Sequence, residues 1–401
     1  MKNFYLLSQI VLKIIFFVRA TCSLLQNIIF SAQFLRNFCG VLILLGELFM
    51  EYIFANIKKF TEPIRILFLC GSTYSKSPND KRNVLKNFLE KDIDNKVILL
   101  EKYFSFNKSQ EDFLSYYDAE LFDLYNIENL AALLSTKIII LHESYSTAGE
   151  IGTFASNPFL KNKIITLVPE RYTIEEEKLS NFLELAFWHR KNKIIDKNVI
   201  RYYPITKTIY VSNKINKYYT YFPNNEIPRN VGKLIKKQIG EKEKVNLSFE
   251  NDSKYGTGYN NPFVKIYDDY AKVNLEFGGF KNYIISMLNI SELKSSLRNC
   301  KKVYEVIEIF DKAFKSILKN TLKNNLKIVP SKIEVTLNDQ ERFNSHDCMK
   351  FAVYMLHACG LMNIKKEDNG DTSVHFPKNT SELIKKYSPL VKPIKPLDWG
   401  E

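Results

Sequence analysis

The sequence predicts an α/β protein whose core is a doubly wound parallel sheet, joined to an α-rich C-terminal region. Three observations support this fold class. Short apolar runs alternate with helical patterns from residue 64 to about residue 200, and the connections between them are short. The runs are continuously apolar, as in parallel strands that are buried on both faces. After residue 290, helical patterns dominate.

Length and composition are those of a globular protein with a basic surface. With 401 residues and 45% hydrophobic residues, the chain can bury a sizeable core and form two or three domains. The formal net charge of +13 favours a polyanionic partner, nucleic acid before anionic lipid; a merely solubilising lysine-rich surface is the third interpretation. The six cysteines are scattered without paired spacing, which indicates a reduced, cytoplasmic compartment.

The first 57 residues are rich in Phe, Leu and Ile and admit two interpretations. Residues 38–57 are about as long as a membrane span, but Glu47 and Glu51 interrupt them, and each charge costs about 2.5 to 3.5 kcal/mol at a bilayer centre. Apolar residues at helical spacing instead predict helices that contact a partner or a membrane surface. Alternatively, the domain proper begins at Met50 and the preceding residues are dispensable. No small-residue cleavage site of a signal peptide follows the apolar start.

The first predicted strand is RILFLC at residues 65–70, and it ends in Gly71 and Ser72. A hydroxyl-rich loop follows, and then a helical pattern at residues 81–90. Backbone N–H groups and hydroxyls in such a turn can bind an anionic group such as phosphate, so Gly71 and Ser72 are candidate substrate contacts. The glycine is equally consistent with a tight turn that binds nothing.

The second predicted strand is KVILL at residues 96–100, and a helical pattern with one apolar face follows at residues 118–134. Glu128 on this helix can face either the ligand crevice or solvent, and it is a candidate substrate contact. A later strand, KIITLV at residues 163–168, and a helix at residues 177–188 continue the alternation.

The stretch KIIILHESYSTAGEIGTF at residues 137–154 carries the candidate catalytic groups. A buried strand is followed by Glu143, a loop of small residues, and Glu150, which stands where the next helix is expected to begin. Ligands of parallel sheets bind at the carboxyl ends of the strands. Both carboxylates can therefore face one crevice, with Ser144 and Gly149 of the loop as candidate substrate contacts.

A pair of carboxylates suits the cleavage of an N-glycosidic bond, because that reaction passes through a positively charged sugar. Glu150 suits the role of nucleophile or charge stabiliser, since the positive end of a helix would keep it ionised. Glu143 suits proton transfer or the binding of ribose hydroxyls. The alternative is structural, with Glu150 as a helix N-terminal acid and Glu143 as a solvent-facing strand end.

Residues 201–290 form a middle region rich in Tyr and Lys. At residues 201–222 lysines are interleaved with tyrosines, which suits contact with a nucleic-acid backbone and stacking on bases; the alternative is an ordinary sheet edge. Residues 237–262 are expected to be exposed loops.

The C-terminal region begins with two expected lysine-rich helices at residues 291–326. A further helix, capped by Ser345, should end at Gly360, and two short strands around the turn at Asn369 and Gly370 should follow. This is the outline of a winged helix, and its nucleic-acid surface would carry Lys350, Lys365 and Lys366. No metal site is expected, because paired ligand spacing is missing among His346, Cys348, His357 and Cys359.

Three segments carry a resemblance to a known family: FLCGS at residues 68–72, YNIENLAALLSTKIIILHES at residues 125–144 and GEIGTFASN at residues 149–157. They resemble the nucleoside 2-deoxyribosyltransferase-like fold, and within it the effector proteins of retron anti-phage systems. The resemblance covers residues 64–170 well and the C-terminal region only in architecture. The residues before Met50 and the Tyr-rich middle region lie outside it.

The resemblance implies a Rossmann-like domain that acts as an N-glycosidase on nucleotides, with NAD as a substrate and no cofactor. It implies that Glu150 is the catalytic residue, that Glu143 is the acid at the preceding strand end, and that Gly71 is the glycine after the first strand. The implied partners are a reverse transcriptase and its RNA–DNA hybrid, which restrain the toxin until infection. A winged-helix-like DNA-binding region is implied as well.

Together these observations predict a hydrophobic helical extension (1–60), a catalytic domain (61–200), a Tyr/Lys-rich middle region (201–290) and a helical, winged-helix-like nucleic-acid-binding region (291–401). We expect a cytoplasmic, oligomeric toxin that hydrolyses NAD or a related nucleotide and that can contact a membrane through residues 1–57. Two other functions stay open. One is a nucleotide-sensing regulator that binds nucleic acid without turnover, and the other is a membrane-active toxin that acts through the N-terminal helices.

Overall fold

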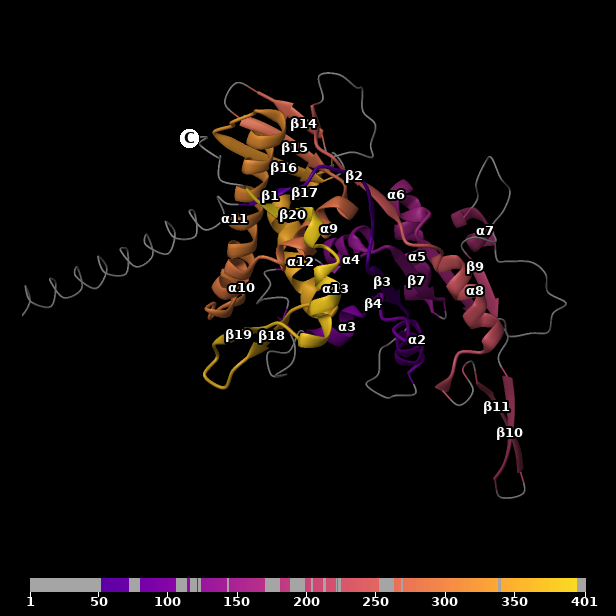
Figure 1. Cartoon of the computed structure of the whole chain (residues 1–401). Helices are drawn as coiled ribbons and strands as arrows, with labels where there is room; N and C mark the ends of the chain where they lie inside the picture. Colours follow the sequence, from indigo (N-terminus) through magenta and orange to yellow (C-terminus); the bar gives the residue numbers. More distant parts are fainter. Residues whose placement is uncertain are drawn as a thin grey trace, which may run out of the picture. The chain divides into compact units, whose positions relative to one another are not determined.

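Five parallel strands form the sheet that the sequence predicts (Figure 1). In this computed structural model, neighbouring strands follow the order β4 (Asn95–Ile98), β3 (Arg65–Cys70), β7 (Lys137–Leu141), β8 (Ile164–Pro169) and β9 (Val199–Tyr202). Every neighbouring pair is parallel. The α/β class with a parallel sheet is therefore confirmed.

The structure describes residues 52–71, 80–105, 114–115, 121, 124–142, 144–169, 181–187, 199–202, 205–211, 214–220, 222, 225–251, 263–267, 270–337 and 340–394. Most of the predicted helical extension at residues 1–60, with its proposed membrane contact, lies outside these ranges. Its described end is not helical, because residues 52–54 and 57–61 form strands that pair with later parts of the chain. Within the ranges, no helix combines the length and apolarity that crossing a bilayer requires. By their contacts Tyr52–Glu401 form one unit, and the domain boundaries drawn inside it from the sequence stay predictions.

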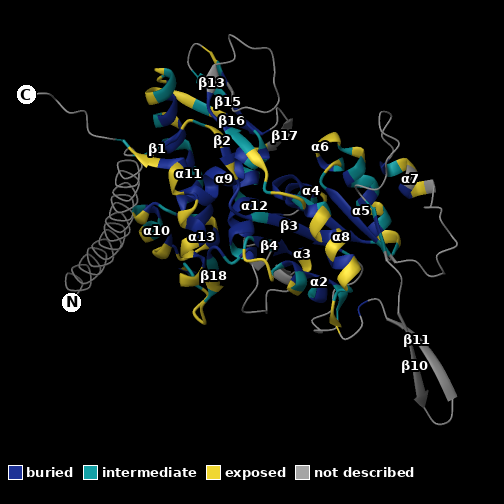
Figure 2. Ribbon diagram, turned by 45° about the vertical axis from the view of Figure 1, so that its right-hand side comes forward, coloured by how far each residue is buried: buried dark blue, intermediate teal, exposed yellow. Residues whose placement is uncertain are grey.

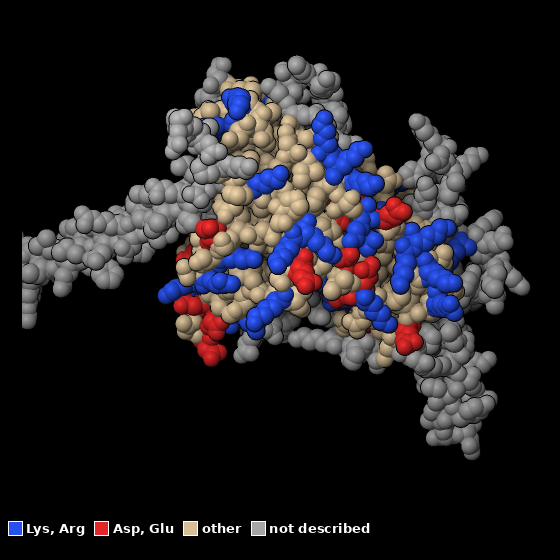
Figure 3. Space-filling view, viewed as in Figure 1, with Lys and Arg blue, Asp and Glu red and all other residues tan. Residues whose placement is uncertain are grey.

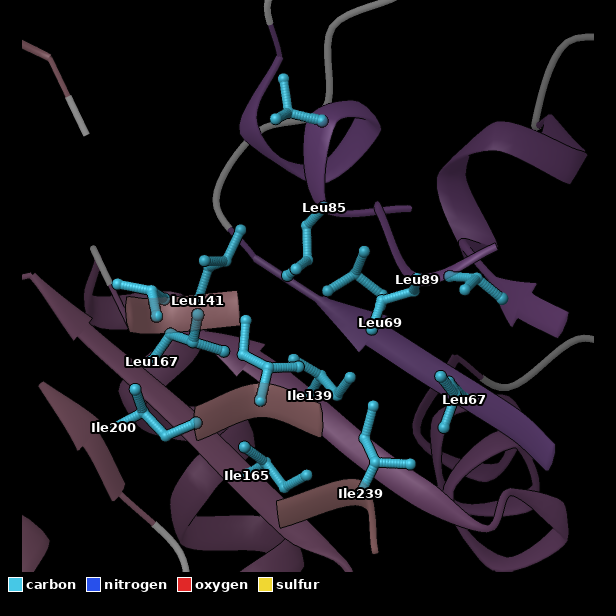
Figure 4. Close-up of a cluster of buried hydrophobic side chains, with 14 of the residues drawn as sticks. Leu67, Leu69, Leu85, Leu89, Ile139, Leu141, Ile165, Leu167, Ile200 and Ile239 are labelled. Atoms are coloured by element: carbon cyan, nitrogen blue, oxygen red, sulfur yellow. The ribbon is translucent and has the colours of Figure 1, made fainter. Parts of the chain in front are cut away.

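One face of the parallel sheet is covered by α2 (Lys81–Leu89) and α8 (Arg229–Ile239). Alternate strand residues point to this face, because side chains alternate across a strand, and they pack against the apolar sides of both helices (Figure 4). The shared cluster includes Leu67, Leu69, Leu85, Ile139, Leu141, Ile235 and Ile239. This packing fixes α2 and α8 against the sheet.

The opposite face carries α4 (Leu124–Leu134) and α5 (Tyr145–Ser156). Phe68 of β3 and Phe154 of α5 meet edge to face here, with ring centroids 6.1 Å apart. The short helices α6 (Pro158–Lys161) and α7 (Asn181–Phe187) follow α5 in the chain. The predicted helix at residues 177–188 is thus present over 181–187, the part of it that the structure describes. Three short elements precede α4: α3 (Leu100–Tyr103), β5 (Phe104–Ser105) and β6 (Leu114–Ser115).

A second, mixed sheet of five strands follows in the chain, and the sequence did not predict it. Its strands, in spatial order, are β13 (Glu250–Asn251), β14 (Phe263–Ile266), β15 (Tyr270–Leu275), β16 (Lys332–Leu337) and β17 (Gln340–Asn344). Helix α9 (Phe277–Met287) is buried along nearly its whole length (Figure 2). Its Lys281 donates to Glu62 at 3.0 Å, a buried ion pair that joins α9 to the segment just before β3.

The middle region departs from the sequence prediction. Residues 237–262 are not all loop, because α8 runs to Ile239 and β12 (Lys244–Leu247) pairs with β2 (Ile57–Thr61). The Tyr- and Lys-rich segment forms a separate antiparallel hairpin of β10 (Ile205–Val211) and β11 (Lys214–Thr220).

The C-terminal helices agree with the prediction. Residues 291–326 form α10 (Ser291–Arg298), α11 (Val303–Thr321) and the π-helical turn η2 (Leu322–Leu326). Helix α12 (Ser345–Ala358) is capped by Asn344, whose side chain accepts from the Asp347 N–H, so the predicted Ser345 cap is wrong by one residue. Gly360 has φ +65°, which is why the helix stops there.

An antiparallel hairpin follows α12, as predicted: β18 (Asn363–Lys366) pairs with β19 (Thr372–His375). Helix-then-hairpin is the order of a winged helix, and that classification stays a prediction. The chain then forms η3 (Lys378–Thr380), α13 (Ser381–Lys385) and η4 (Ser388–Leu390). Finally β20 (Val391–Pro393) pairs with β1 (Tyr52–Phe54), which brings the two ends of the described chain together.

Candidate functional site

The candidate site lies where β3 and β7 end side by side. These strands are neighbours in the sheet, although β4 and α4 lie between them in the chain. The chain adds β4 on one side of β3 and then builds β7, β8 and β9 on the other side. Open α/β sheets bind ligands at such a switch point, beyond the carboxyl ends of the strands. Gly71 follows β3 at this point, and His142 follows β7.

The segment between β7 and α5 is fixed by a capping box. The Thr147 N–H donates to Ser144 Oγ at 3.4 Å, and the Ser144 N–H donates to Thr147 Oγ1 at 3.1 Å. Thr147 is fully buried, and its hydroxyl lies 3.3 Å from His142 Nδ1. Burial lowers the pKa of His142, so the ring is neutral near pH 7. These contacts set the residue at which α5 begins.

The position of Glu150 on α5 differs from the sequence prediction. The residues expected to form a loop already belong to the helix, which begins at Tyr145, so Glu150 lies in its second turn. The expectation that the helix end keeps Glu150 ionised is therefore wrong, because the helix dipole acts within the first turn. Burial instead raises the pKa of Glu150 to about 8, with further contributions from the charges of Glu128 and Glu101 and a partial offset from Arg82.

Glu150 also holds an unsatisfied oxygen. Its Oε2 is buried, and no hydrogen-bond partner for it exists among the residues that the structure describes. A buried carboxylate oxygen without a partner costs free energy, and such groups cluster where a ligand supplies the missing contact. Oε2 is thus a buried polar atom that a ligand could satisfy.

Two more carboxylates join Glu150 from other elements. Glu128 on α4 is half-buried, and its pKa is raised by burial and by the charge of Glu101. Glu101 lies on α3, just after the carboxyl end of β4. The same three carboxylates, after burial, raise the pKa of the buried Cys70 thiol, which therefore stays protonated and is no nucleophile. We call Glu101, Glu128 and Glu150 the carboxylate cluster.

One guanidinium balances part of this negative charge. Arg82 in the first turn of α2 has only 2% of its side chain exposed, and its Nη1 donates to Glu101 Oε1 at 2.6 Å. The side chain passes directly over Gly71, where an added Cβ would lie 2.8 Å from Arg82 Cδ. Glycine is needed at this position because no Cβ fits beneath the arginine.

The predicted site residues fall into three groups. Glu128 lies near enough to Glu150 for its charge to raise the pKa of Glu150, and Gly71 packs against Arg82, whose charge lowers the same pKa. Two further predicted residues lie on or beside the same helix as Glu150: Ser144 caps α5, and Gly149 is exposed within it. The remaining two, Glu143 and Ser72, lie outside the described residues.

Sequence reasoning missed Glu101 and Arg82. The rule that selected Glu143, an acid directly after a buried strand, applies equally to Glu101 after KVILL and would have found it. Arg82 gives no comparable signal, because a basic residue in a helix pattern is usually exposed.

The residues predicted to contact nucleic acid lie on α12 and β18. Lys350 is 3.5 Å from Asp347 in an ion pair on α12, and Lys365 is exposed on β18 beside Lys366. Within the described part of the chain, no group of His, Cys, Asp and Glu side chains is arranged to hold a metal ion. His357 Nδ1 instead accepts from the Ile364 N–H at 3.1 Å, which ties α12 to the hairpin.

Comparison with known proteins assigns the chain to a family. A family model described as STM3845 retron effector protein matches residues 78–364, well over half of the chain. The chain belongs to this retron effector family. No curated protein matches it. The predicted identity as a retron effector is thereby confirmed, and with it a role in retron anti-phage defence.

The family match also bears on the site of this retron effector. It begins before α2 and ends within β18, so it includes Arg82 and the whole carboxylate cluster. It also extends through α8 and the whole second sheet, whereas β3 and Gly71 lie before its start. The match thus covers four strands of the parallel sheet together with the second sheet.

Proposed function

We propose that this retron effector is an N-glycosidase that hydrolyses the bond between ribose and base in NAD or a related nucleotide. The observation that carries the proposal is the buried, unpartnered Oε2 of Glu150 inside the carboxylate cluster at the switch point of the sheet. The proposed parent fold is the nucleoside 2-deoxyribosyltransferase-like one, which the parallel sheet with its site between β3 and β7 supports.

The charge of the cluster suits this reaction. Among the described residues, Glu101, Glu128 and Glu150 outnumber the guanidinium of Arg82, so this group carries excess negative charge when fully ionised. Cleavage of an N-glycosidic bond develops positive charge on the ribose ring, which a carboxylate at C1′ stabilises. NAD adds a second reason, because its nicotinamide is a pyridinium cation that enters the site already charged.

The protonation state of Glu150 connects binding to reaction. With a pKa of about 8, Glu150 is mostly protonated in the empty site at neutral pH. A cationic substrate would lower this pKa, because an opposite charge nearby favours the ionised form. The proton then leaves to solvent, and the carboxylate faces C1′ as nucleophile or charge stabiliser.

The proposed hydrolysis consumes one water molecule. The C1′–N bond breaks, its electron pair passes to the pyridinium nitrogen, and neutral nicotinamide leaves. Water adds its oxygen to C1′ and releases a proton, so the products are nicotinamide, ADP-ribose and H⁺. We assign to Glu128 the binding of ribose hydroxyls or the acceptance of that proton, a role that the sequence assigned to Glu143.

Membership of the retron effector family supports association with a retron system. We propose that a reverse transcriptase and its RNA–DNA hybrid restrain the glycosidase until infection, and that it acts in the cytoplasm, where NAD is abundant. In the empty site Glu150 is mostly protonated, and substrate binding must first remove this proton. A partner that blocks the site would therefore keep Glu150 in its inactive, protonated form.

The test is release of nicotinamide from NAD by the purified chain, compared with Glu150→Gln. Glu276→Gln is a matched control, because burial also raises the pKa of Glu276, which lies on the second half of the chain outside the carboxylate cluster. We expect release by the wild type and by Glu276→Gln, and none by Glu150→Gln. Full activity of Glu150→Gln would show that Glu150 is not the catalytic residue. If an activated wild-type chain leaves NAD and a panel of nucleotides and nucleosides intact, the protein is not a glycosidase, and a protein that binds nucleotides without turnover becomes the better interpretation.

A further inference from the structure

Helix α8 carries four cations and no acid. Arg229, Lys233, Lys236 and Lys237 are all exposed. Their spacing of four, seven and eight residues from Arg229 places them along one side of the helix. Figure 3, viewed as Figure 1, shows lysine and arginine side chains gathered over this helix. We call these four residues the α8 cation stripe.

The cations of this stripe form no ion pair with any described residue. Within the described residues, no carboxylate lies within ion-pair distance of any of the four, and Lys236 Nζ instead lies 5.6 Å from the centroid of the Phe88 ring. Elsewhere on the chain lysines are paired at short range: Lys312 with Glu308 at 3.1 Å, and Lys315 with Asp311 at 2.6 Å. Like charges on neighbouring turns repel each other, and a polyanion bound along the row would remove this repulsion.

The other side of α8 decides which polyanion fits. A helix that lies on an anionic membrane buries its apolar side in the lipid. In α8 that side is already used, because Val231, Ile235 and Ile239 are buried in the cluster against the parallel sheet (Figure 4). Apart from Leu234, the exposed side of α8 is polar or charged, so the contact is mainly electrostatic and suits a phosphate backbone better than a bilayer.

We infer that the α8 cation stripe binds the phosphate backbone of a nucleic acid. Arg229 and Lys237 are eight residues apart, about 12 Å along the helix, which matches three to four successive phosphates of one strand of a duplex. The inference rests on the RNA–DNA partner of the proposed function and not on the reaction. Binding can therefore be measured whether or not NAD is cleaved.

The stripe differs from the surface that the sequence predicted. On the C-terminal hairpin, Glu367, Asp368 and Asp371 lie beside the predicted lysines, and Asp371 is within 3.9 Å of Lys301. These acids would repel phosphates. In contrast, the charges of α8 itself are all positive.

The experiment measures binding of the full chain to a fluorescein-labelled RNA–DNA hybrid duplex by anisotropy, over a range of salt concentrations. The test variant is Lys233→Gln/Lys237→Gln. The matched control is Lys319→Gln/Lys323→Gln, two exposed lysines with the same spacing on α11 and η2. A third variant, Lys365→Gln/Lys366→Gln, tests the hairpin, and circular dichroism checks that all three fold.

We expect Lys233→Gln/Lys237→Gln to weaken binding and to reduce the slope of log K against log salt by about 1.8, because each phosphate contact contributes about 0.9. The two other variants should keep the wild-type slope. Equal losses in the α11 control, or a loss confined to the hairpin variant, would overturn the inference. Binding to vesicles of anionic lipid that depends on the stripe, without binding to the hybrid, would overturn it as well.

Discussion

The raised pKa of Glu150 predicts that replacing this residue stabilises the protein at high pH. In the folded state this pKa is about 8, against an ordinary value of 4.5. Between these two pH values the folded chain holds a proton that the unfolded chain has lost, so wild-type stability falls as the pH rises through this window. Gln cannot ionise, so Glu150→Gln escapes this loss. The difference between variant and wild type should be smallest below pH 4.5 and reach its maximum above pH 8.

The size of this effect follows from the shift. Each pKa unit corresponds to about 1.4 kcal/mol, so the full shift sets a ceiling of about 5 kcal/mol on the pH-dependent gain. Solvent at this half-buried side chain screens part of it, and we expect about 2 to 3 kcal/mol. This gain is the stability that the wild type gives up to hold a carboxylate at the site.

Urea unfolding of both chains between pH 4.5 and pH 9 measures the gain, since titrations common to the two chains cancel in the difference. Glu226→Gln, at an exposed carboxylate in the segment before α8, controls for the loss of one charge. A stability difference between Glu150→Gln and wild type that does not change across this range would refute the reasoning, because Glu150 would then titrate as it does in the unfolded chain.

Three further predictions concern the surroundings of Glu150. Glu128→Gln removes the first of the charges that raise the pKa of Glu150, so that pKa should fall by about one unit in carbon NMR of labelled glutamate. An unchanged pKa would show that the charge of Glu128 does not act on Glu150. Gly71→Ala forces a Cβ to within 2.8 Å of Arg82 Cδ, and it should lower the melting temperature and the glycosidase activity together; wild-type values for both would show that the arginine moves aside freely. Thr147→Val breaks the capping box and should cost about 1 kcal/mol in denaturant unfolding, whereas an unchanged midpoint would mean that packing alone fixes the start of α5.

The parallel sheet could be predicted because its strands are local signals. RILFLC, KIIIL and KIITLV are short, continuously apolar and bounded by turns, and each forms a strand within a residue or two of the predicted limits. The second sheet has no such signal. Its central pair joins β15 to β16 in parallel, although α9, α10 and α11 lie between them in the chain, so only tertiary packing reveals it.

Helix α8 escaped prediction for a physical reason. Its apolar residues Val231, Ile235 and Ile239 have perfect helical spacing, but Gly232 weakens the pattern and no side chain caps the start. Gly232 is there because Phe88 of α2 packs against it, with a ring atom 2.9 Å from where a Cβ would lie. Gly232 thus allows α2 and α8 to pack closely, and at the same time it weakens the sequence pattern that would predict α8.

The site was predicted in part, and the rest depended on geometry. Glu150 and Glu128 could be named because they follow or precede the predicted strand β7 at the sheet edge where ligands bind. The raised pKa of Glu150 could not be predicted, since it arises from burial and from charges on α3 and α4 that only folding brings near. Arg82 enters the cluster only because α2 packs across the end of β3.

The most direct test of the central proposal is a chromatographic assay of NAD incubated with the purified chain, with and without its nucleic-acid partner, beside Glu150→Gln. The proposal predicts nicotinamide and ADP-ribose from the wild type in equal amounts and neither product from the variant. Equal product from wild type and variant would contradict the role of Glu150. No product from any nucleotide by an activated wild-type chain would contradict the glycosidase itself.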